Sequence, residues 1–63
     1  MAETLTLTPH HNGKLGVVHV AVTEDHTLYV GGERTRVEDG EEKVLERTGI
    51  TVRRNGDEYV FSK

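Results

Sequence analysis

The stretch ITVRRNGDEYVF (residues 50–61) carries the clearest structural signal in this sequence of 63 residues. Two runs rich in β-branched and aromatic residues flank Asn55-Gly56, a dipeptide that favours a two-residue hairpin turn. Such a turn places oppositely charged side chains across from each other, Arg54 with Asp57 and Arg53 with Glu58. It also gathers the apolar side chains on one face, Ile50, Val52, Tyr59 and Phe61. Turn type, charge pairing and apolar pattern agree, so we expect a β-hairpin here.

The segment before this hairpin predicts a short helix. Asp39 suits a helix N-cap, with a glutamate three positions later, and Gly49 is typical of the residue after a helix. We expect about two helical turns at Glu41–Thr48, which need a sheet to pack on because so short a helix is unstable alone. Its core-facing side chains would be Val44, Leu45 and Thr48. An alternative remains open, in which a further pair of strands turns at Glu38-Asp39-Gly40.

A second hairpin is predicted upstream of the helix. Thr27–Val30 and Glu33–Val37 read as strands, and Gly31-Gly32 between them suits a two-residue turn. That register sets Tyr29 opposite Arg34. An aromatic ring beside a guanidinium across two strands is a favourable pair.

The first third of the chain is the most apolar. Thr4–Thr8 alternates strictly between threonine and leucine, as in a half-buried strand. Pro9–Gly13 has turn composition. Lys14–Thr23 reads as one long strand with apolar side chains on both faces, so we expect both of its faces to be covered.

These segments predict the order β-β-β-β-α-β-β in a single domain, residues 1–63. The expected class is mostly β (α+β), a small curled antiparallel sheet or barrel of about six strands with one short helix. In layout alone this resembles an SH3-like barrel, and such folds host many functions. The sequence shows neither a signal peptide nor an apolar run of membrane-spanning length, so we expect a complete cytoplasmic protein without a membrane partner.

Charge is unevenly distributed along the chain. Residues 1–32 contain four charged side chains, whereas residues 33–63 contain fifteen. Chains of this size rarely bury enough apolar surface, and without cysteine no disulfide can compensate. We therefore expect a non-catalytic interaction or assembly module. Its partner would be a second copy, as a homodimer or higher oligomer, or a larger protein assembly. The expected contact surface is the apolar N-terminal hairpin, comprising Leu5, Leu7, Leu15, Val17, Val18, Val20 and Val22.

The alternative function is a small nucleic-acid-binding regulator with an aromatic and basic sheet face. The residues for this role are Tyr29, Arg34, Arg36 and Arg53. A net charge of −3 counts against it, because nucleic-acid-binding domains are usually basic.

The sequence favours neither an enzyme nor a metal or cofactor protein. The one serine, Ser62, is penultimate, and no partnered nucleophile stands out. Four histidines in so short a chain raise the question of zinc, but no cysteine or helical His spacing supports a site. We therefore predict no catalytic residue, no metal ligand and no cofactor.

Overall fold

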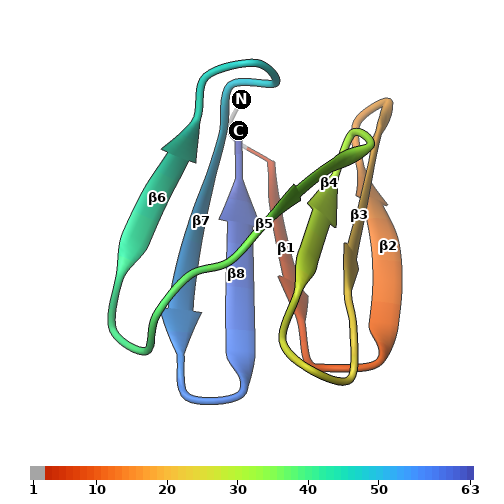
Figure 1. Cartoon of the computed structure of the whole chain (residues 1–63). Coiled ribbons are helices and arrows are strands. Elements are labelled where there is room, and N and C mark those ends of the chain that lie inside the picture. Colours follow the sequence, from red (N-terminus) through yellow and green to blue (C-terminus); the bar gives the residue numbers. More distant parts are fainter. Residues whose placement is uncertain (1–2) are drawn as a thin grey trace.

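In the computed structural model, which describes residues 3–63, eight strands form two antiparallel sheets of four strands each (Figure 1). The strands are β1 (Thr4–Leu7), β2 (His11–Leu15), β3 (Val18–Val22), β4 (Leu28–Val30), β5 (Glu33–Thr35), β6 (Glu42–Leu45), β7 (Ile50–Asn55) and β8 (Glu58–Ser62). One sheet has the order β1-β8-β7-β6 and the other the order β2-β3-β4-β5. The first and last of the described residues, Glu3 and Lys63, lie side by side and exchange backbone hydrogen bonds.

One apolar core lies between the sheets. Alternate residues of each strand point inward, so the period-2 pattern of the sequence becomes an inner and an outer face. The buried apolar side chains come from both sheets and comprise Leu7, Leu15, Val20, Val22, Leu28, Val30, Val37, Leu45, Ile50, Val52, Tyr59 and Phe61. Two partly buried residues, Leu5 and Val18, pack against them.

The expected helix at Glu41–Thr48 is wrong, and with it the α+β class, because the described chain is all β. Residues 42–45 form β6, which pairs with β7 over four register positions. In the turn between β6 and β7 the Gly49 amide donates to the Leu45 carbonyl at 2.8 Å. Asp39 caps the other hairpin instead, since its carboxylate accepts from the Gly56 amide at 2.8 Å. A two-turn helix leaves most of its terminal backbone groups unpaired, whereas the strand joins a ladder.

The single long strand expected at Lys14–Thr23 is also wrong. Gly16-Val17 turns the chain there, and β2 and β3 pair on either side with Leu15 opposite Val18. Gly16 has a φ of +66°, which suits a tight turn. The turn expected at Pro9–Gly13 is shorter and comprises only Pro9-His10. The strand before it, β1, pairs with β8 and not with the strand that follows it in the sequence. The first two strands therefore belong to different sheets.

The two predicted hairpins around Gly31-Gly32 and Asn55-Gly56 exist, but only the first has the predicted register. Tyr29 lies opposite Arg34 as expected. In the second hairpin the loop is Gly56-Asp57, which moves each partner by two positions, so that Arg54 lies opposite Tyr59. A shift of two keeps every side chain on its face. The four apolar residues predicted to share a face are accordingly all buried, Ile50, Val52, Tyr59 and Phe61.

The turn at Gly31 offers a test of this packing. Gly31 has a φ of +57°, and a Cβ there would lie 3.0 Å from the methyl group of Thr48, in the loop that joins β6 to β7. We expect Gly31→Ala to lower the free energy of unfolding by about 1–2 kcal/mol. Gly32→Ala is the matched control, because Gly32 also has a positive φ but an added Cβ meets nothing within 4 Å. Equal losses of stability in urea unfolding would show that the contact with Thr48 has no effect.

Candidate functional site

A row of outward-facing side chains crosses the sheet β2-β3-β4-β5 in register. Asn12 on β2 lies opposite Ala21 on β3, and Ala21 lies opposite Tyr29 on β4. Tyr29 in turn lies opposite Arg34 on β5. In the neighbouring row Lys14 pairs with His19. The apolar alternation of these strands buries Val20, Val22, Leu28 and Val30, and that burial forces the polar residues between them outward.

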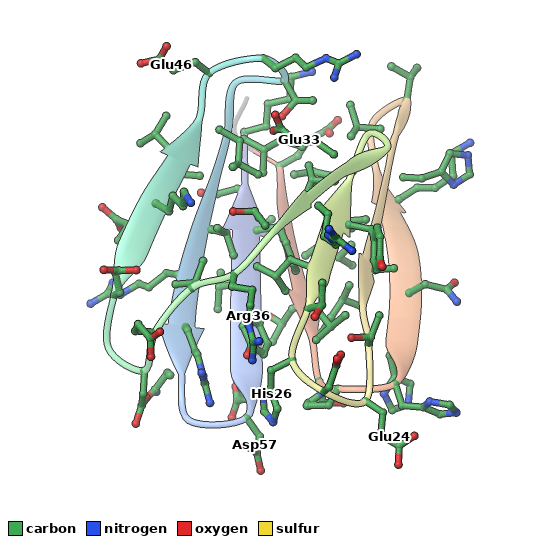
Figure 2. The ribbon with its side chains drawn as sticks, in the orientation of Figure 1. Glu24, His26, Glu33, Arg36, Glu46 and Asp57 are labelled. Carbon is green, nitrogen blue, oxygen red and sulfur yellow. The ribbon has the colours of Figure 1, made fainter. Side chains whose placement is uncertain are left out.

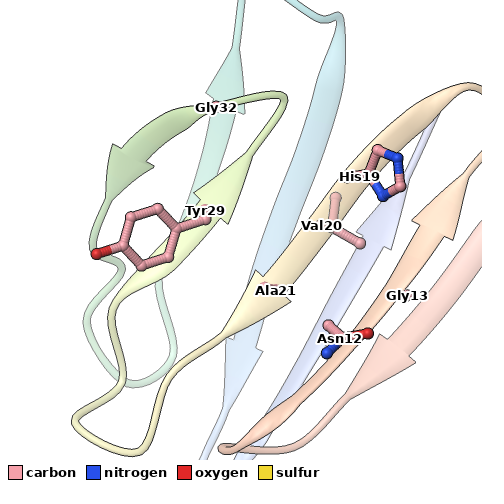
Figure 3. Close-up of a pocket in the computed structure, with 7 residues that line it drawn as sticks. All are labelled: Asn12, Gly13, His19, Val20, Ala21, Tyr29 and Gly32. Carbon is pink, nitrogen blue, oxygen red and sulfur yellow. The ribbon is translucent and has the colours of Figure 1, made fainter.

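A shallow hollow of about 230 Å³ lies on this outer face (Figure 3). Figure 3 shows the Tyr29 ring on one side of β3 and the His19 imidazole on the other. The floor between them is low because Ala21 has a small side chain and Gly32 has none. Tyr29 is 40% exposed, so its side chain is available for contact.

The charge on this face has one sign. Lys14 and Arg34 are exposed on β2 and β5, and none of the outward-facing residues of β2–β5 is acidic. The nearby acids are not on the outward-facing positions of these strands. Figure 2 shows Glu24 and Glu33 toward opposite ends of the molecule, and Glu33 is half-buried. Asp25 lies beside Glu24 in the β3–β4 turn, and the Glu3 carboxylate lies close to Gly16 in the β2–β3 turn. A cationic face with an aromatic ring at its centre therefore exists on a protein whose net charge is −3.

The residues predicted to bind nucleic acid are only partly brought together. Tyr29 and Arg34 are register partners. Arg36 follows β5, and its Nη2 donates to the Asp25 backbone carbonyl at 3.2 Å. Arg53 lies on β7 in the other sheet, opposite Glu42 and Val60, so it belongs to a different surface.

Three residues of this face were missed at the sequence level: Asn12, Lys14 and His19. Recognising Gly16-Val17 as a hairpin turn would have found two of them, because a two-residue loop there places Lys14 opposite His19. The largely apolar, β-branched composition of residues 15–22 predicts one continuous strand there, and so the turn was missed.

Most of the residues predicted for self-association lie in the core. The buried ones are Leu7, Leu15, Val20 and Val22, and the partly buried ones are Leu5 and Val18. Val17 alone among them is freely accessible, with 86% exposure at the tip of the β2–β3 hairpin. The apolar surplus in residues 4–22 is therefore used in packing the two sheets together.

Three of the four histidines have roles in turns. His10 and His26 adopt positive φ values of 70° and 66°, and the His10 amide donates to the Val22 carbonyl at 2.8 Å. The His11 Nδ1 lies 2.9 Å from the Thr8 hydroxyl, within the same corner. Within residues 3–63, no three His, Asp or Glu side chains gather closely enough to hold a metal ion.

His26 also links the two sheets at one end of the molecule (Figure 2). Its Nδ1 and the Tyr59 hydroxyl share a hydrogen bond of 2.7 Å, and the Arg54 guanidinium carbon lies 5.5 Å from the centre of the Tyr59 ring. Burial raises the pKa of the Tyr59 hydroxyl, and the positive charges of Arg54 and Arg36 oppose that rise. Tyr59 is fully buried, so this cluster stabilises the fold and presents no open site.

Thr23 and Thr27 stabilise the turn between β3 and β4. The Thr27 amide donates to the Thr23 hydroxyl oxygen at 3.0 Å, and the Thr23 hydroxyl donates to the Asp25 carboxylate. The hydrogen bond from the Thr23 hydroxyl, followed by one from the Thr27 side chain, lowers the pKa of the Asp25 carboxyl.

None of the residues from 3 to 63 belongs to a helix with the length and apolar character that crossing a membrane requires. Comparison of the chain with protein-family models, with curated proteins and with solved structures found no significant match.

Proposed function

We propose that this protein is a non-catalytic binding module that takes an anionic partner on the outer face of β2–β5. The observation that carries the proposal is the register of that face: an exposed aromatic ring between two cationic side chains, with no outward-facing acid on the four strands. Electrostatic complementarity of this kind steers an oppositely charged partner and fixes its place. A cytoplasmic location, expected from the sequence, is part of the proposal.

Charge reversal tests where the partner binds. We expect the double variant Lys14→Glu, Arg34→Glu to weaken the binding of a polyanion such as long-chain polyphosphate by about tenfold or more at ~50 mM salt. Both side chains are exposed, so the fold has no reason to change. Isothermal titration calorimetry measures the affinity, and amide chemical shifts of ¹⁵N-labelled protein map the contact.

The matched control carries the same change of charge on the opposite sheet. Arg53→Glu together with Lys63→Glu removes two cations from β7 and the C-terminus, and both residues are exposed. The proposal predicts that this control reduces binding far less than the first pair. Equal losses, or shift changes centred on β6–β8, would contradict it.

As a second candidate, we propose self-association through the outer face of the sheet β1-β8-β7-β6. The observation that favours it is an uncharged row across all four strands, Thr4, Ser62, Thr51 and Val44. Val44 is 60% exposed. A second copy could cover this row without burying an unpaired charge, which is the main cost of hiding a charged face. The next row pairs Arg53 with Glu42. A two-fold axis between two copies would place Arg53 of one copy against Glu42 of the other.

The size of the molecule limits how tight such a dimer can be. Its principal extents are 27 × 19 × 17 Å, so one face contributes on the order of 500 Å² per copy, below the ~800 Å² of a standard stable complex. We expect sedimentation equilibrium to show a dimer only at high protein concentration, and Val44→Asp to abolish it. Val17→Asp is the control, because Val17 is even more exposed but lies at a hairpin tip. A monomer at every concentration would exclude this candidate.

A further inference from the structure

We propose that the anionic partner is single-stranded nucleic acid, with a base stacked on Tyr29 and phosphates bound by Lys14 and Arg34. This inference rests on the proposed function, because it names the ligand of the same face. It depends on three features of that face: the exposed ring, the low floor beside it, and the position of the two cations.

The hollow is suited to a planar ring. Tyr29 forms one wall, and the floor of Ala21 and Gly32 lets a flat group approach the sheet closely. The His19 imidazole stands on the far side of the hollow (Figure 3). Bases of single strands bind to protein sheets in this way, by stacking on aromatic side chains that tolerate any sequence.

The cations flank the ring rather than surround it. Lys14 lies on the edge strand β2 and Arg34 on the opposite edge strand β5, with the hollow between them. Neighbouring strands lie ~4.8 Å apart, so the two edge strands are separated by about 14 Å. A polynucleotide that crosses the sheet meets a cation, the base-sized hollow and a second cation in turn.

The ring distinguishes single-stranded nucleic acid from other polyanions. In a duplex the bases are stacked on one another and are not free to stack on Tyr29. Polyphosphate and acidic peptides of aspartate or glutamate offer charge without a planar ring. Affinity that depends on the Tyr29 ring therefore identifies the single strand.

Fluorescence anisotropy of a labelled 15-nucleotide oligothymidine tests the inference at ~50 mM salt, where contacts with phosphate are strongest. We expect Tyr29→Ala to weaken binding by about tenfold or more and Tyr29→Phe to change it by less than about threefold, because phenylalanine keeps the stacking surface. The logarithm of affinity should fall with the logarithm of salt concentration with a slope of about −1.4 for two phosphate contacts, and Lys14→Ala should halve that slope. Circular dichroism and thermal unfolding verify that each variant is folded.

The controls separate this inference from the proposed function. Arg53→Ala removes a cation from the opposite sheet and should leave oligothymidine binding within about twofold. If polyphosphate or a 15-base-pair duplex binds as tightly as oligothymidine, or if Tyr29→Ala has no effect, the nucleic-acid inference is overturned while the anionic face stands. If Lys14→Glu, Arg34→Glu also leaves every polyanion bound, the proposed function itself fails.

Discussion

Replacing Tyr59 with alanine is expected to bring the protein close to unfolding at room temperature. Tyr59 is fully buried on β8, and its hydroxyl holds His26 in the turn between β3 and β4. Truncating a large buried aromatic side chain costs about 3–5 kcal/mol, because the cavity left behind closes only in part. A domain of this size has a total stability of roughly 3–9 kcal/mol, so the loss is a large fraction of it.

Tyr59→Phe is the matched control for this prediction. It keeps the ring in the core, including the surface under Arg54, and removes only the hydrogen bond to His26. We expect a loss of about 1 kcal/mol, typical of one hydrogen bond. Circular dichroism and urea unfolding measure both variants. If Tyr59→Ala were as stable as the wild type, the assignment of Tyr59 to the core would be refuted.

Alkaline solution is expected to destabilise the protein through the same residue. Burial raises the pKa of Tyr59 above its ordinary value of 10.0. In the unfolded chain the hydroxyl ionises near its ordinary pKa, while the folded chain still holds the proton. The stability is therefore complete below about pH 10 and is lost as the pH rises toward the pKa of the folded state. The decline reaches at most about 1.4 kcal/mol per pH unit, the value for one proton.

Urea unfolding between pH 8 and pH 11 checks this expectation. Tyr59→Phe has no proton to lose at that position, so its stability should decline less steeply than that of the wild type. In Tyr29→Phe the remaining tyrosine is Tyr59, and its phenolate absorbance should rise at a higher pH in the folded protein than in the urea-unfolded protein. Identical pH profiles for the wild type and Tyr59→Phe would disprove the link.

Local patterns were enough to predict much of the sheet structure. The hairpin at Gly31-Gly32 was predicted with its register, because two glycines leave a two-residue turn as the natural connection and the strands follow from it. The apolar face of residues 50–61 was also correct, although the register shifted by two. Alternation determines the face of each residue, whereas the exact loop also depends on contacts such as that of Asp39 with the Gly56 amide.

The helix shows how a local signal can mislead. Asp39 and Gly49 have the chemistry of helix ends, and both are used in turns. The same residue types satisfy backbone groups in either setting, so they cannot by themselves distinguish a capped helix from a hairpin. The pairing of β6 with β7, with Leu45 opposite Ile50, decides in favour of a strand. The alternative strand pair turning at Glu38-Asp39-Gly40 is also wrong, because β5 and β6 belong to different sheets.

The candidate site was half predicted. Tyr29 and Arg34 lie in one hairpin, so their proximity could be deduced from the turn between them. Arg53 could not be placed, because its distance from that hairpin depends on which sheet each strand joins. Lys14 and His19 lie at the same face because β2 pairs with β3 and β3 with β4, an order set by the whole sheet.

By itself the sequence determined that this chain forms short strands, which residues of most strands face inward and where several turns fall. These properties depend on period-2 alternation and on glycine conformations within a few residues. Only the tertiary structure decided that β1 joins β8 across the length of the chain, that residues 42–45 extend, and that the apolar surplus near the N-terminus is buried. Those outcomes depend on contacts between distant segments, whose free energy comes from burying both sheets against each other and not from any local pattern.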